Sequence, residues 1–181
     1  SLHRQGLSFP HGSVDDVGKG SLVSQGANYS VHQSSAGNHY ACGSSISPGN
    51  DLSAGTLGSL VRLADGLMYG LTNNHVSALC SHVEIGTPIL APGVADVRAN
   101  GIDPFTLGSH VRALEMHHGS VGNINITMNT DAAIFRIRDE LQVSSMQGNS
   151  YDTPCAVADP VEGMRVAKVG RTTGITRGQI V

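Results

Sequence analysis

Three features of the sequence predict an all-β protein organised as a closed antiparallel barrel. Short apolar or alternating runs of strand length recur along the chain, and turn signals separate them. Glycine occurs 23 times in 181 residues, whereas an average usage of about 7% would give about 13. Asp65-Gly66 lies between two apolar runs and is a strong hairpin signal. Many short strands joined by tight turns are typical of a barrel.

The first half of the chain leads into a predicted hairpin. Residues 1–40 are rich in Gly, Ser, Asn and His, and we expect an N-terminal arm or loop laid over the barrel. A short strand is predicted over 41–46, followed by a turn over 47–51. The next two strands, 55–63 and 67–72, are joined at Asp65-Gly66.

The return half of the barrel is predicted to begin with a strand over 83–91, whose proline favours an edge or a bend. Residues 92–104 are expected to form a loop, and 106–116 a longer strand. A glycine-containing segment then leads to a strand that starts near Asp131 and ends at Ile137. We therefore assign residues 41–138 to one barrel.

Beyond the barrel, the composition changes. Residues 139–160 are polar and are predicted to be an exposed linker. Residues 164–169 alternate apolar and polar side chains, which indicates a half-buried strand, and a turn at 170–174 leads toward a partner strand over 178–181. Two strands cannot close a barrel, so we expect 161–181 to begin a second barrel that its own C-terminal part completes, as a second chain or a missing segment.

A histidine and an aspartate both lie at the ends of predicted strands. His75 follows the strand that ends at Thr72, and Asp131 precedes the apolar run 132–135. An imidazole can transfer protons near neutral pH, and a carboxylate can fix its tautomer. Each residue also has an ordinary interpretation: His75 satisfied by backbone groups, and Asp131 capping a turn.

Four blocks of the chain resemble the trypsin-like (chymotrypsin-fold) serine endopeptidases, in particular a bacterial branch. The resemblance implies a chymotrypsin-like six-stranded barrel followed by the first hairpin of a second one. It also implies peptide-bond hydrolysis with a Ser-His-Asp triad, in which His75 is the general base and Asp131 the orienting acid, on a protein or peptide substrate and without a cofactor. The blocks are Ala54–Gly58, Leu71–Val76, Asn129–Ile134 and Val169–Gly178.

The family's nucleophile motif, Gly-Asp-Ser-Gly, does not occur in the sequence. Cys155 is the one thiol with a faint claim, although it precedes the second barrel. The resemblance places the serine, the oxyanion hole and the specificity pocket in the remainder of the second barrel, so we expect this chain alone to be inactive. The alternative is a catalytically inactive protease-like scaffold that binds peptides or proteins. Six serines lack the Gly-x-Ser-x-Gly elbow: Ser44, Ser45, Ser59, Ser109, Ser120 and Ser150.

Charge indicates neither a nucleic-acid partner nor a membrane partner. The formal charge is −3 and basic residues are scattered. No run of about 18 apolar residues and no signal-peptide pattern occurs, so we expect a soluble protein of open localisation.

The cysteines and histidines predict no metal site. Cys42, Cys80 and Cys155 lack ligand spacing and are expected to be buried thiols, although the resemblance offers a Cys42–Cys80 bridge. His110, His117 and His118 lack acidic or cysteine partners at ligand spacing, and we expect them in exposed loops. The resemblance gives Asn73 and Asn74 the task of holding the corner that aims His75, while ordinary turn asparagines would look the same.

Overall fold

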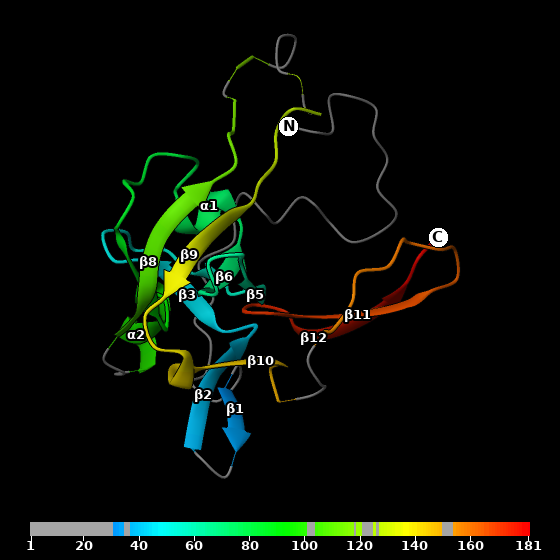
Figure 1. The fold of residues 1–181 in the computed structure, drawn as a ribbon, viewed down its shortest axis with the longest axis horizontal. Helices are drawn as coiled ribbons and strands as arrows, with labels where there is room; N and C mark the ends of the chain where they lie inside the picture. Colours follow the sequence, from blue (N-terminus) through cyan, green and yellow to red (C-terminus); the bar gives the residue numbers. More distant parts are fainter. Residues whose placement is uncertain are drawn as a thin grey trace.

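The computed structural model describes residues 31–34, 37–100, 104–117, 119–120, 125, 127–149 and 154–181. Strands dominate, and the helices are short (Figure 1). This confirms the predicted all-β class. The elements are β1 Val31–Ser34, β2 Gly37–Cys42, β3 Ser45–Pro48, β4 Gly55–Thr56, β5 Ser59–Arg62, β6 Met68–Thr72, α1 Asn74–Ser77, β7 Pro88–Ala91, α2 Val94–Asn100, β8 Phe105–Ala113, β9 Ala133–Ile137, the 3₁₀ turn η3 Glu140–Gln142, β10 Val143–Gln147, β11 Arg165–Gly170 and β12 Gly174–Gln179.

The main sheet has seven strands in the order β4-β3-β7-β8-β9-β6-β5. Its two outer strands, β4 and β5, are separated only by Leu57 and Gly58. The Leu57 amide donates to the Ser44 carbonyl beside β3, and the Gly58 amide donates to the Leu71 carbonyl of β6, both at 2.9 Å. Counted as one interrupted strand, β4 and β5 therefore join both ends of the sheet. The result is the predicted six-stranded antiparallel barrel.

The barrel core is apolar and is packed closely where β6, β8 and β9 meet. Phe135 of β9 is fully buried. A Cβ on Gly70 would lie 2.3 Å from the Phe135 ring, and a Cβ on Gly108 would lie 2.0 Å from the Arg136 carbonyl oxygen. Only glycine fits at these two points, and this close contact fixes β6 against β9. The other fully buried large apolar side chains are Ile46, Leu57, Ile89 and Leu107.

Several local predictions differ from the structure. The segment 92–104 contains α2 instead of only loop. Part of the predicted linker forms β10, which pairs in parallel with β2 and buries Val143 and Gln147. The two serines and the glutamine of β10 give the strand a low apolar content, so its sequence did not indicate a strand. Residues 31–34 and 37–40 of the predicted arm form most of the β1–β2 hairpin, and residues 1–30 lie outside the described part. The domain boundaries stay predictions.

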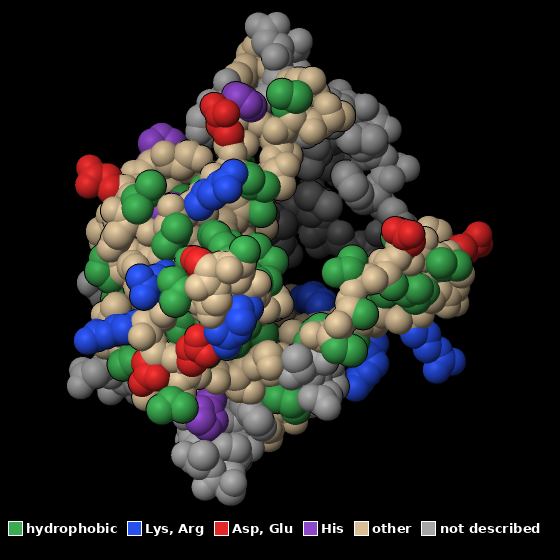
Figure 2. Space-filling view, viewed as in Figure 1, with side chains coloured by type: hydrophobic (Ala, Val, Ile, Leu, Met, Phe, Trp, Pro, Cys, Tyr) green, Lys and Arg blue, Asp and Glu red, His purple; other side chains and the backbone are tan. Residues whose placement is uncertain are grey.

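The predicted C-terminal hairpin is present as β11 and β12, which pair from Arg165 opposite Gln179 to Gly170 opposite Gly174. It projects from the barrel (Figure 1), and no other described strand pairs with it. Met164 and Val166 are 37% and 42% exposed. Figure 2 shows hydrophobic side chains along this hairpin, and acidic and basic side chains interspersed over the visible face.

A buried ion pair anchors the turn of the hairpin to the barrel. The Arg171 guanidinium donates from Nη2 to Asp96 Oδ1 and from Nε to Asp96 Oδ2, the latter at 2.8 Å, and both side chains are at most 5% exposed. The Ser45 hydroxyl donates to Asp96 Oδ2. The Arg171 amide donates to Thr56 Oγ1 at 3.0 Å. One carboxylate thus ties α2, β3 and the hairpin together.

The cysteines form no disulfide among the described residues, which include all three. The Cys42–Cys80 bridge is therefore not formed. Cys42 is buried, and burial raises the pKa of its thiol to about 11. Cys155 is exposed, so the expectation of a buried thiol was wrong there. Across the described ranges, no helix has the length and apolar character needed to cross a membrane.

Candidate active site

His75 lies on α1, a single helical turn that follows the end of β6. The backbone at Asn73 is extended, with φ −80° and ψ 151°, and its carbonyl accepts the amides of Val76 and Ser77 at 3.1 Å. Asn74 and Ser77 are fully buried and Val76 is 9% exposed, whereas the His75 side chain is 55% exposed. The buried neighbours hold the turn against the barrel, so the imidazole is presented at the surface.

Asp131 reaches His75 because β6 and β9 are paired. In this antiparallel pair Thr72 lies opposite Ala133, so the residues just after β6 and just before β9 meet at one end of the barrel. His75 Nδ1 lies 2.5 Å from Asp131 Oδ2, and the His75 amide donates to Asp131 Oδ1 at 2.9 Å. The structure thus brings together the two residues that the sequence placed at strand ends.

The carboxylate receives a third donor. Asn73 Nδ2 donates to Asp131 Oδ2 at 3.2 Å and to the Asp131 backbone carbonyl at 2.9 Å. Partial burial opposes ionisation of Asp131 and alone would raise its pKa. The hydrogen bonds from the His75 amide and ring, the charge of His75 and the Asn73 amide outweigh that effect and hold the Asp131 pKa below its usual value.

Asn74 has a different task from Asn73. Its Nδ2 donates to Ser81 Oγ at 2.8 Å and to the Leu114 carbonyl at 2.7 Å, and its Oδ1 accepts the Ser81 amide at 2.8 Å. Leu79, Cys80 and Ser81 have φ of 48°, 58° and 69°, a left-handed conformation that non-glycine residues rarely adopt. The buried amide of Asn74 therefore braces the strained loop that follows α1. The sequence predicted the same role, holding the corner that aims His75, for both Asn73 and Asn74.

The other candidate residues do not join this pair. Within the described ranges, Asp131 is the only hydrogen-bond partner of the His75 ring, so no described serine or cysteine forms a hydrogen bond with it. Ser45 is buried and bonds Asp96, and Ser150 lies outside the described residues. Cys155 lies exposed in the segment before β11.

The remaining histidines are scattered. His110 was expected in an exposed loop, but it lies on β8 and is 3% exposed, with its Nδ1 3.5 Å from Ser77 Oγ. Burial lowers its pKa. His117 is exposed and lies 3.7 Å from a Glu115 oxygen, while His118 is outside the described residues. In the described part of the chain, no group of three potential ligands could hold a metal ion.

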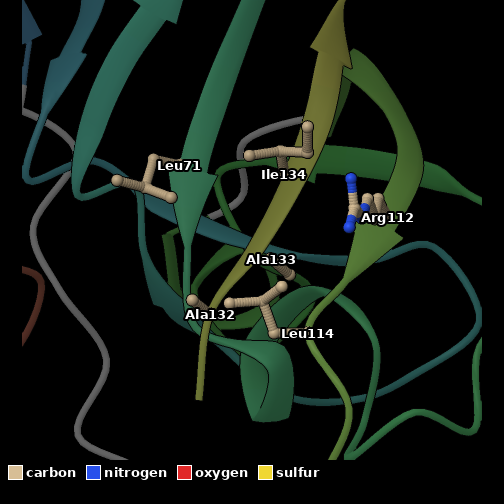
Figure 3. Close-up of a pocket in the computed structure, with 6 residues that line it drawn as sticks. All are labelled: Leu71, Arg112, Leu114, Ala132, Ala133 and Ile134. Atoms are coloured by element: carbon tan, nitrogen blue, oxygen red, sulfur yellow. The ribbon is translucent and has the colours of Figure 1, made fainter. Parts of the chain in front are cut away.

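A mainly apolar pocket of about 240 Å³ is lined in part by the residues that directly follow Asp131. Ala132, the residue after Asp131, contributes to its lining, as do Leu71 of β6 and Ile134 of β9 (Figure 3). Arg112 of β8 adds the one charged side chain. The pocket therefore offers an apolar surface with a single cation, and part of its lining is next in sequence to Asp131.

No family model matches the chain, and no curated protein matches it. Among solved structures, the chain is similar to the crystal structure of Nocardiopsis protease (NAPase), with a TM-score of 0.47 and 19% identity. The similarity covers 76% of this chain and 58% of that chain, so the chain spans less than two thirds of the length of that protein.

Proposed function

We propose that this chain is the base-bearing and acid-bearing part of a serine endopeptidase. The observation that carries the proposal is the contact of 2.5 Å between His75 Nδ1 and Asp131 Oδ2 at an exposed end of the barrel. This contact occupies one ring nitrogen. The other, Nε2, has no partner among the described residues, and it is the atom that would accept a proton from a nucleophile.

In the proposed reaction, Nε2 of His75 takes the proton of a serine hydroxyl as that oxygen attacks the peptide carbonyl. His75 then gives the proton to the leaving amine. Asp131 keeps the remaining proton on Nδ1 and stabilises the imidazolium. The serine and the oxyanion hole come from a C-terminal part of the protein, which is thus a partner of this chain. The substrate is a protein or peptide, and no cofactor takes part.

Labelling with a serine-directed fluorophosphonate tests the proposal. The 181-residue chain should remain unlabelled, and the protein completed by its C-terminal part should be labelled and should hydrolyse peptides. His75→Ala should abolish both properties, and Asp131→Asn should lower turnover by about 10⁴ if the chymotrypsin precedent transfers. His117→Ala and Glu115→Gln are matched controls, because both residues are exposed and outside the site. Labelling of the short chain would contradict the proposal.

The second candidate is an inactive protease-like scaffold that binds peptides. The apolar pocket beside Ala132 favours it, as does the absence of a serine at His75 among the described residues. A completed protein that binds peptide without being labelled would select this candidate.

A further inference from the structure

We propose that Asn73 is a positioning residue that fixes the Asp131 carboxylate through its side-chain amide. The catalytic importance of Asn73 rests on the proposed function, whereas its contacts with Asp131 are observed in the structure. Asp131 Oδ2 receives two donors, His75 Nδ1 at 2.5 Å and Asn73 Nδ2 at 3.2 Å. The same Asn73 nitrogen also donates to the Asp131 carbonyl at 2.9 Å. One amide group therefore clamps both the backbone and the side chain of Asp131.

The local helix geometry points to the same assignment. Asn73 occupies the N-cap position of α1, where an asparagine side chain normally accepts a backbone amide of the first turn. Here it makes no capping hydrogen bond. Asp131 Oδ1 accepts the His75 amide instead, at 2.9 Å. Asn73 therefore does not cap the helix itself. Its side-chain amide donates to Asp131, and the Asp131 carboxylate accepts the first-turn amide in its place.

The clamp matters because water can reach Asp131, whose side chain is 34% exposed. Without a second donor, the carboxylate could rotate and exchange its contact with His75 for water. A donor directed at Oδ2 also favours the ionised carboxylate, which is the form that accepts the hydrogen bond from Nδ1–H of His75. Asn73 therefore controls both the orientation and the charge of Asp131.

The test compares two substitutions of Asn73. Asn73→Asp keeps the shape of the side chain but replaces the donor with a second carboxylate, whereas Asn73→Ala removes the whole side-chain amide. The titration of Asp131 is followed by ¹³C NMR at its carboxyl carbon in the 181-residue protein. We expect the Asp131 pKa to rise in Asn73→Ala and to rise further in Asn73→Asp, because like charges disfavour a second ionisation. Asn50→Asp, an isosteric change at an exposed turn after β3, should leave the titration unchanged.

The low-field proton resonance of His75 Nδ1–H provides a second readout, and it should shift or broaden in both Asn73 variants. In the completed protein, Asn73→Ala should lower kcat by about tenfold, the equivalent of one pKa unit, with KM unchanged. A wild-type Asp131 titration and Nδ1–H signal in folded Asn73→Asp and Asn73→Ala would overturn the inference. The NMR measurements do not need hydrolysis. If the Asn73 variants change these NMR signals but the completed protein does not hydrolyse peptides, the proposed function is wrong. The control of Asp131 by Asn73 would still hold.

Discussion

Replacing Asp96 by Ala removes the counter-ion of Arg171 from a buried site. The two side chains are 2% and 5% exposed, and breaking a buried pair on one side costs about 3–5 kcal/mol because the remaining charge has no partner. The Ser45 hydroxyl also loses its acceptor, which adds about 1 kcal/mol. We therefore expect the free energy of unfolding to fall by about 4–6 kcal/mol, a large share of the roughly 5–15 kcal/mol typical of a domain.

Urea unfolding provides the assay. With a slope of about 2 kcal/mol/M, a loss of this size lowers the midpoint by about 2–3 M. Glu140→Gln is the matched control. It breaks the Arg62–Glu140 pair, whose side chains are 50% and 46% exposed, and exposed pairs contribute little to stability. Its midpoint should match that of the wild type.

A double variant separates charge from packing. Asp96→Leu combined with Arg171→Met replaces the pair with apolar side chains, and such replacements are often neutral or stabilising. We expect this variant to recover most of the midpoint lost by Asp96→Ala. Amide exchange in β11 and β12 shows whether the hairpin is released first. An Asp96→Ala midpoint and an exchange pattern both equal to those of the wild type would refute the reasoning.

Two further predictions concern the candidate site. Asn74→Ala should lower the free energy of unfolding by about 1–3 kcal/mol in urea, because it removes a fully buried amide whose part-buried hydrogen bonds satisfy the Ser81 amide and the Leu114 carbonyl; an unchanged midpoint would contradict the bracing role. The folded-state pKa of Asp131 is lowered, so its contribution to stability is present above its unfolded pKa of about 3.9 and is lost as pH falls through the folded value. Asp131→Asn should therefore flatten the stability profile below about pH 4 in acid-unfolding scans, and a slope there equal to that of the wild type would contradict this.

Much of the barrel could be predicted because its signals are local. Asp65-Gly66 marks a hairpin, and Gly66 indeed has φ of +78°. The apolar run after Asp131 becomes β9, whose inward side chains alternate at Ala133, Phe135 and Ile137. In each case, neighbouring residues alone carry the pattern.

The missed features depend on distant partners. Asp96 is one carboxylate in a segment predicted to be loop, and nothing near it in the sequence indicates Arg171, 75 residues away. The strand β10 has few apolar residues and exists through its pairing with β2. Asn73 and Asn74 are identical in type, so the sequence could not show that one contacts Asp131 and the other Ser81.

In the proposed site, the His75–Asp131 pair and the serine are positioned by different parts of the structure. The His75–Asp131 pair is built by the barrel alone, since β6 and β9 are locked in register around Phe135 and Gly70. The hairpin β11–β12 is anchored chiefly through the turn at Arg171. In the proposed peptidase, residues that follow β12 bring the serine, so the buried Asp96–Arg171 pair governs where the nucleophile stands relative to a base that is already in place. Loss of the Asp96–Arg171 pair would therefore misplace the serine relative to His75, while the contact between His75 and Asp131 is kept.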